Sequence, residues 1–336
     1  MIGLYTRLLA RCRTVNQVHQ VHIALETRMT PPDVRELERE VPRRLPGTTD
    51  TMSLDPASRG GQVAAAVGRS RPATAFPPEA HAWVAQLSDW AAKSGKAEPE
   101  PFVRRRVRPN VLSFSAGGRS VSKTLVVCFT GMKGRLFMPI PVVLQHLPSA
   151  DFDLIVLRDP SRNGYRSGVA GVANDFAGLA DAVGGLFDRR AYRAVVTYGI
   201  SAGGLPAIVT ALRLGLDKAV SVGGKGPLDP RWQDVCAGGV GAMLREYARD
   251  VAAPPNLLYV HGADSPPDAD SARDLAQVVP LRTLAVHGGE GREIGHNPLL
   301  PLLRRSRLGA FLGSALDAGV AGFVRGHGSA PARIEV

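Results

Sequence analysis

The chain has 336 residues and an ordinary globular composition, 44% hydrophobic and 21% charged, which excludes the disordered and collagen-like classes. Its formal charge is +11, from 41 lysines and arginines against 30 aspartates and glutamates, and the excess is spread along the chain. The cysteines Cys12, Cys128 and Cys236 lie far apart, which excludes a disulfide framework or a zinc ribbon and is typical of a reducing compartment.

The sequence predicts neither a signal peptide at its N-terminus nor a membrane span. Arg7 interrupts the only apolar stretch of the N-terminal segment, and no small-residue cleavage site follows. No window of the chain approaches the roughly 20 uninterrupted apolar residues that a membrane span requires. We therefore expect a soluble, cytoplasmic protein without a membrane span.

Residues 1–105 are predicted to form a helical and irregular N-terminal extension. Residues 46–80 are rich in Gly, Pro, Ser and Thr, which predicts a flexible stretch. Between residues 81 and 95, Trp83, Leu87 and Trp90 recur at helical spacing, which predicts an amphipathic helix. We expect this extension to serve as a helical cap or a packing extension.

The densest basic cluster is the run Arg104-Arg105-Arg106-Val107-Arg108. It lacks the interleaved aromatic residues on which single-stranded nucleic acids stack, and no helix-turn-helix or zinc motif accompanies it. We expect a solvated, arginine-rich surface and no nucleic-acid partner. Binding of another anionic partner is the alternative.

Beyond residue 105, short apolar runs rich in β-branched residues alternate with longer helical patterns. Strands are predicted at 110–115, 123–130, 153–158, 192–198, 217–222, 256–261 and 282–287, and helices at 138–147, 169–188, 202–214, 241–251, 267–278 and 298–318. This alternation indicates an α/β fold with a mostly parallel central sheet and helices on both faces. The predicted α/β domain spans residues 106–320, and residues 321–336 form a C-terminal tail. In such sheets ligands bind at the carboxyl ends of the strands.

The turn after the predicted strand at 192–198 contains Gly199-Ile200-Ser201-Ala202-Gly203, which satisfies G-x-S-x-G between a strand and a helix. Such a turn holds the serine in an unfavourable backbone conformation with its hydroxyl exposed, and its flanking glycines face neighbouring backbone. We predict that Ser201 is a nucleophile. A purely structural turn is the alternative, whereas a dinucleotide-binding turn would need glycine in place of Ser201.

A nucleophilic serine needs a base, and His296 is the candidate. It lies in the polar loop EGREIGHNPLL after the last predicted strand, from which it can turn back toward the strand ends. The base in turn needs an orienting carboxylate, and the segment HGADSPPDADSA supplies Asp264, Asp268 and Asp270. We prefer Asp264 because it is nearest the strand end. Asp268 is the alternative acid, although capping of the next helix also explains it.

Acyl chemistry also needs hydrogen-bond donors for the developing oxyanion. The loop that follows the strand at 123–130 begins near Met132, so the backbone N–H groups of Met132 and Ala202 form the expected pair. Basic side chains follow in the loops at this edge of the sheet, and they predict a substrate with carboxylate or phosphate groups; Lys133, Arg135 and Arg162 are the candidate binding residues, with Arg158 and Arg166 nearby. Ordinary solvated surface is the alternative.

The order Ser201, Asp264, His296, with a strand and a glycine loop upstream, resembles the α/β-hydrolase superfamily over about residues 106–320. The run GISAGG is similar to the serine turn of hormone-sensitive-lipase-like esterases, but Phe-Thr-Gly-Met stands in place of their His-Gly-Gly-Gly motif. The resemblance implies the α/β-hydrolase fold and hydrolysis of a carboxylic ester or thioester through an acyl-enzyme.

The expected substrate is a small-molecule or carrier-linked acyl compound, and this chemistry needs no cofactor or metal. Two alternatives are open on the sequence. One is acyl transfer to an alcohol or amine by the same residues, and the other is a catalytically silent accessory or binding protein. The sequence does not indicate an oligomeric state.

Overall fold

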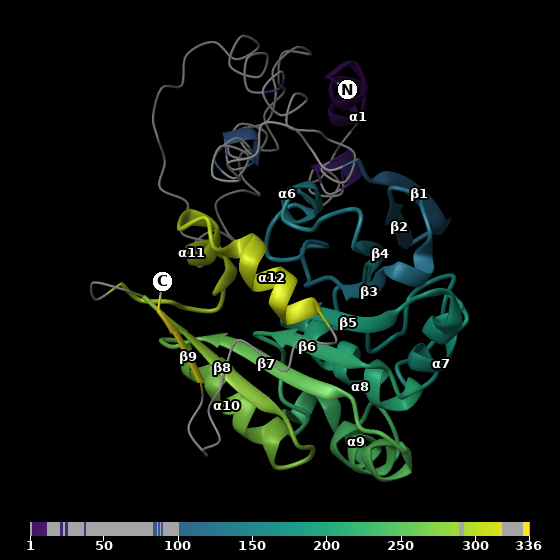
Figure 1. Cartoon of the computed structure of the whole chain (residues 1–336), viewed down its shortest axis with the longest axis vertical. Helices are drawn as coiled ribbons and strands as arrows, with labels where there is room; N and C mark the ends of the chain where they lie inside the picture. Colours follow the sequence, from purple (N-terminus) through teal and green to yellow (C-terminus); the bar gives the residue numbers. More distant parts are fainter. Residues whose placement is uncertain are drawn as a thin grey trace. The chain divides into compact units, whose positions relative to one another are not determined.

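The computed structural model describes residues 2–11, 21–22, 24–25, 37, 83–85, 87, 89, 101–288, 292–317 and 332–335 (Figure 1). The chain divides into two compact units. The first comprises Met1–Pro99 with Pro139–Val142, and the second comprises Glu100–Met138 with Val143–Val336.

In the first unit, helix α1 (Ile2–Ala10) carries Tyr5 into a buried aromatic cluster. The Tyr5 hydroxyl lies 3.3 Å from Nε2 of His22, and the His22 ring stacks on Trp83 with centroids 4.6 Å apart. Leu87 is also buried, as its helical spacing with Trp83 predicts. The stretch 46–80, for which flexibility is predicted, lies outside the described residues.

The second unit is built on a nine-stranded sheet with the order β1-β2-β4-β3-β5-β6-β7-β8-β9. The strands are β1 (Val103–Arg108), β2 (Val111–Ser115), β3 (Thr124–Phe129), β4 (Phe152–Leu157), β5 (Ala194–Ile200), β6 (Lys218–Val222), β7 (Asn256–Gly262), β8 (Arg282–His287) and β9 (Ala332–Glu335). Strands β4 to β9 of this order pair in parallel, whereas β2 is antiparallel to β4 and β1 is antiparallel to β2. The predicted mostly parallel sheet is confirmed.

α-Helices connect most of these strands. They are α6 (Ile140–Leu144), α7 (Leu179–Gly184), α8 (Gly204–Leu214), α9 (Gly239–Asp250), α10 (Pro266–Ala276), α11 (Leu299–Arg304) and α12 (Leu308–Leu316). Short 3₁₀ turns occur at Ser120–Ser122, Arg189–Ala191, Ser201–Gly203 and Pro230–Trp232. Among the helices that the structure describes, none is long and apolar enough to cross a membrane.

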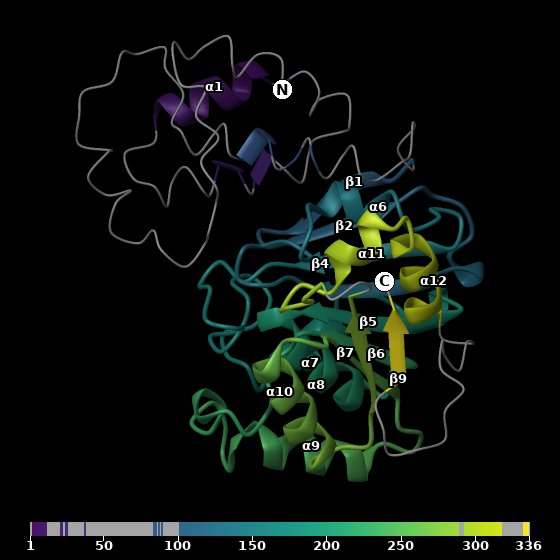
Figure 2. The same ribbon diagram turned by 90° about the vertical axis from the view of Figure 1, so that its left-hand side faces the viewer.

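Helices cover both faces of the sheet. Successive residues of a strand point to opposite faces, and on β6 Ala219 belongs to the core beneath α8, whereas Lys218 donates to the carbonyl oxygens of Ser314 and Asp317 at the end of α12. Both views place α11 and α12 on one side of β5 and β6 and α8 and α9 on the other (Figure 1 and Figure 2). The predicted helices on both faces are therefore confirmed.

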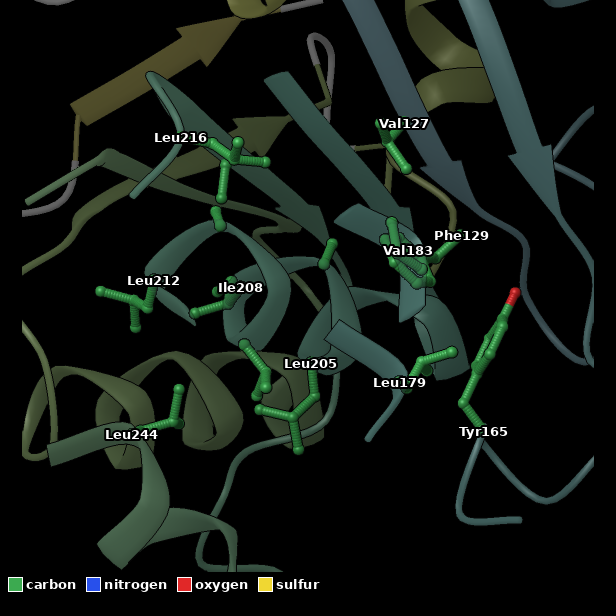
Figure 3. Packing of buried hydrophobic residues seen from close by; sticks show 14 of the residues in the cluster. Val127, Phe129, Tyr165, Leu179, Val183, Leu205, Ile208, Leu212, Leu216 and Leu244 are labelled. Atoms are coloured by element: carbon green, nitrogen blue, oxygen red, sulfur yellow. The ribbon is translucent and has the colours of Figure 1, made fainter. Parts of the chain in front are cut away.

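The main core lies between the sheet and helices α7, α8 and α9. Figure 3 shows part of it, with Ile208 and Leu212 from α8, Leu244 from α9, and Val127 and Phe129 from β3. All the residues of β3, β4, β5 and β6 are buried, which is why the sequences of these strands are mostly apolar.

Strand β3 lies in the interior of the sheet, between β4 and β5. The chain passes from β3 to β4 on one side and from β5 to β6 on the other, so the connections that follow β3 and β5 start side by side and then run in opposite directions. Crevices at such points are the usual ligand sites of parallel sheets. The loop after β3 and the turn after β5 are therefore brought together here.

Several elements differ from the sequence prediction. The arginine cluster at 104–108, for which a solvated surface is expected, lies in edge strand β1, which was not predicted and in which all residues except one are exposed. Charged side chains on such an edge discourage pairing with other chains. Residues 332–335, assigned above to a C-terminal tail, form β9 beside β8.

Of the helix predicted at 169–188, only the part that forms α7 is helical. The helix predicted at 298–318 is divided into α11 and α12. Residues 169–173 instead form a tight loop, in which Val169 pairs with Ala173. Gly168 begins it at φ +67°, and a Cβ there would lie 2.3 Å from the Ala173 carbonyl oxygen. A positive φ at Ser306, 56°, separates α11 from α12.

Candidate active site

Ser201 directly follows β5 and has a φ of 49°, which is rare for a residue other than glycine. Such a conformation costs of order 1–3 kcal/mol and persists only where the surrounding structure enforces it. Here the enforcing contacts involve the two glycines of the motif. A Cβ on Gly199 would lie 2.0 Å from the Gly203 carbonyl oxygen, and one on Gly203 would lie 2.2 Å from the Phe129 carbonyl oxygen. The spacing G-x-S-x-G thus reflects the close packing of β3, β5 and the start of α8.

Gly203→Ala is expected to lower the free energy of unfolding by about 1–3 kcal/mol, because the added methyl group meets backbone of β3 that has no room to move. The matched control is Gly313→Ala in α12, where a Cβ would meet nothing within 4 Å. That control should be neutral or stabilising, since alanine favours helices by up to about 1 kcal/mol over glycine. Urea unfolding of both variants measures the difference. Equal midpoints for Gly203→Ala and the wild type would contradict this steric account.

Three side chains from distant parts of the chain form one hydrogen-bonded series. The Ser201 Oγ lies 2.9 Å from Nε2 of His296, and Nδ1 of His296 lies 2.8 Å from Oδ2 and 3.0 Å from Oδ1 of Asp268. Ser201 comes from the turn after β5, Asp268 from the first turn of α10, and His296 from the loop before α11. This is the geometry of a nucleophile, its base, and a group that orients the base.

The preference for Asp264 as the partner of His296 is wrong, and the alternative Asp268 occupies that position. Asp264 is exposed, and its Oδ2 accepts a hydrogen bond of 2.8 Å from the backbone N–H of Ile294. Asp268 is 1% exposed and also accepts from the Ser265 hydroxyl at 2.8 Å. Asp270 forms an ion pair with Arg273 on the outside of α10.

Two residues that the sequence analysis did not identify as part of the site lie against the His296 ring. Phe137 packs against it edge to face, with centroids 5.2 Å apart and an interplanar angle of 83°. Gly223 follows β6 at φ +59°, and a Cβ there would lie 3.1 Å from Cε1 of His296. In the sequence, the pair Gly223-Gly224 at a strand end indicates that another segment approaches the backbone closely there. For Phe137, at φ 62°, the sequence carries no such indication.

The loop after β3 passes directly beside the serine turn. A Cβ on Gly131 would lie 3.5 Å from the Cβ of Ser201, and the loop turns back through a bond of 2.8 Å from the Gly134 N–H to the Gly131 carbonyl. Within the part of the chain that the structure describes, the Met132 N–H donates to no backbone oxygen. Met132 is next to Gly131 and Ala202 is next to Ser201, so both candidate oxyanion donors lie close to Ser201.

The basic candidates differ in their surroundings. Lys133 and Arg135 belong to the loop beside Ser201, with Lys133 exposed and Arg135 half-buried. Arg166, by contrast, pairs with Asp234 at 2.8 Å. Arg162 is half-buried in the loop after β4, and no contact of the described residues connects it to Ser201.

A buried carboxylate organises the loop after β4. Asp159 accepts backbone hydrogen bonds of 2.9 Å from four residues of the loop: Ser161, Asn163, Gly164 and Tyr165. The Tyr165 hydroxyl lies 3.0 Å from the carbonyl oxygens of Thr130 and Leu157, which ties the loop to the ends of β3 and β4. Burial raises the pKa of Tyr165, so it stays a neutral donor.

The described residues contain no group of three or more His, Cys, Asp or Glu side chains placed to hold a metal ion. The site consists of the serine, histidine and aspartate series together with backbone N–H groups. These groups can carry out nucleophilic attack, proton transfer and stabilisation of an oxyanion.

No protein-family model matches the chain, and no curated protein matches it either. Solved structures match the chain at low identity and with TM-scores below 0.5. Esterase B from Lactobacillus rhamnosis is 15% identical, with 70% of this chain and 95% of that one covered and a TM-score of 0.40. The esterase of Pyrobaculum calidifontis is 14% identical, with 70% and 91% covered and a TM-score of 0.44. The 2,6-dihydroxy-pseudo-oxynicotine hydrolase is 15% identical, with 94% and 93% covered and a TM-score of 0.46.

Proposed function

We propose that this chain is a serine hydrolase of the α/β-hydrolase type, which cleaves a carboxylic ester or thioester through an acyl-enzyme on Ser201. The observation that supports the proposal is the unbroken series from the Ser201 Oγ through His296 to the buried Asp268, with 2.9 Å and 2.8 Å between successive groups. The unfavourable backbone conformation of Ser201 adds to it, because strain of this kind is concentrated at functional sites.

In the proposed reaction, the Ser201 Oγ attacks the substrate carbonyl while Nε2 of His296 takes the hydroxyl proton. The N–H groups of Met132 and Ala202 donate to the oxyanion of the tetrahedral intermediate. His296 then returns the proton to the leaving alcohol or thiol, and the acyl-enzyme forms. Water, deprotonated by the same nitrogen, releases the acid. Asp268 keeps the proton on Nδ1, so that Nε2 is free to act as the base.

Labelling by a fluorophosphonate probe tests this proposal, because only an activated serine reacts with it. The wild type should be modified on the peptide that contains Ser201, and Ser201→Ala should not be modified. The matched control is Ser122→Ala, an exposed serine that precedes β3 at the opposite end of the strand, which should label as the wild type does. A wild type that does not react, or a Ser201→Ala variant that still does, would contradict the assignment.

We further propose that the substrate carries negative charge near its acyl group, because Lys133 and Arg135 lie in the loop beside Ser201. The ratio of kcat/KM for an anionic ester to that for a matched neutral ester should exceed 1 at low salt. Lys133→Gln should lower the ratio about 3–10-fold, because a positive charge beside the site raises the local concentration of anions.

The preference should also fade as the ionic strength rises, since screening shortens the field to about 8 Å near physiological salt. Arg245→Gln is the matched control, because this arginine is exposed on α9 and its loss removes the same charge elsewhere. A ratio that neither salt nor Lys133→Gln changes would show that these basic residues are ordinary surface.

A further inference from the structure

The described segment that carries His296, residues 292–298, lies between β8 and α11 and has no regular secondary structure. It is called here the histidine loop. The position of the imidazole therefore depends on whatever holds this backbone. A displacement of about 1 Å at a reacting group can cost roughly 100-fold in rate, so this support matters for catalysis.

Asp264 holds the histidine loop through two hydrogen bonds to a single residue. The Asp264 N–H donates to the Ile294 carbonyl at 3.1 Å, and the Ile294 N–H donates to Oδ2 of Asp264 at 2.8 Å. Ile294 is buried, and it precedes His296 by only two residues. The second of these bonds has a charged acceptor, and such bonds are stronger than those between neutral groups.

The backbone at the end of β7 is shaped for this contact. A Cβ on Gly262 would lie 2.1 Å from the carbonyl oxygens of both Ile294 and Gly295, so the two segments touch without an intervening side chain. The Ala263 N–H continues the ladder to β8 by donating to Val286 at 2.9 Å. These bonds direct Asp264 toward the histidine loop, while the following turn carries Asp268 to the ring.

We propose that Asp264 is a positioning residue for His296, which acts by fastening the histidine loop to the segment that presents Asp268. The short stretch of chain from Asp264 to Asp268 then fixes the base in two ways. Asp268 orients the ring through Nδ1, and Asp264 fixes the backbone from which the ring projects. This inference rests on the proposed function, because positioning has an effect on rate only if His296 is the base.

The test compares Asp264→Ala with Asp264→Asn. An asparagine keeps a side-chain oxygen that can accept from the Ile294 N–H, so Asp264→Asn should retain kcat within about 3-fold, whereas Asp264→Ala should lower kcat about 10- to 100-fold. KM should change little in either variant, because neither side chain contacts the substrate. Retention of kcat in Asp264→Asn would show that Asp264 acts by positioning. If Asp264 were instead the acid of the triad, an amide in its place would lower kcat.

Hydrogen exchange of the Ile294 amide is a readout that does not depend on activity. Its exchange should be about tenfold faster in Asp264→Ala than in the wild type and nearly unchanged in Asp264→Asn. Unchanged exchange and kcat in Asp264→Ala would overturn the inference, as would equal losses of kcat in both variants. A wild type whose Ser201 does not label would instead refute the proposed function, and the exchange measurement would still show whether Asp264 fastens the loop.

Discussion

Replacement of Ser201 by alanine is expected to lower kcat for a p-nitrophenyl ester by roughly a millionfold, the magnitude seen when a triad nucleophile is removed. In the proposed reaction the Oγ is the atom that forms the acyl-enzyme, and alanine leaves the Cβ and the backbone unchanged. The glycine contacts that enforce the turn are independent of the hydroxyl. Steady-state kinetics with one ester for the wild type and the variant give the ratio directly.

His296→Ala should cost about as much as Ser201→Ala, because the two residues act as a unit through the bond of 2.9 Å between them. The double variant should then show no further loss. Ser122→Ala is the control for the substitution itself, and urea unfolding checks that the variants are folded. Turnover near that of the wild type in Ser201→Ala, or losses that multiply in the double variant, would refute the assigned roles.

Asp268→Asn is expected to lower kcat by about 10⁴-fold, as happens when the acid of such a triad is made neutral. The carboxylate accepts from Nδ1 of His296 through both oxygens and is almost fully buried, so no water substitutes for it. An amide offers Nδ1 an N–H donor and favours the tautomer with its proton on Nε2, where the imidazole no longer accepts the serine proton.

The matched control is Asp270→Asn on the same helix, since Asp270 is exposed and pairs with Arg273. This variant should keep kcat within about twofold, because an exposed ion pair contributes little. The kcat values of the two variants are measured with the same ester. Their difference distinguishes the effect of losing the buried carboxylate from the effect of changing the charge on α10. Wild-type kcat in Asp268→Asn would show that Asp268 has no part in the reaction.

Much of the sheet was predictable because burial on both faces imposes a simple sequence pattern. The seven predicted strands correspond to β2 through β8, and each end differs from the observed one by two residues or fewer. Strands β1 and β9 were missed because an edge strand need not be apolar. In β1, arginines occupy both faces of the strand, so neither alternation nor an apolar run appears in the sequence.

The amino-acid sequence by itself determined the parallel sheet, the serine turn with its glycines, and the pairing of that serine with a histidine far along the chain. These depend on local sterics and on the periodicity of buried strands, which the sequence carries directly. Only the tertiary structure decided between Asp264 and Asp268, and only it placed Phe137 against His296. In loops without periodicity, side-chain direction is set by contacts with distant backbone, here that of Ile294, and such contacts have no counterpart in residue spacing.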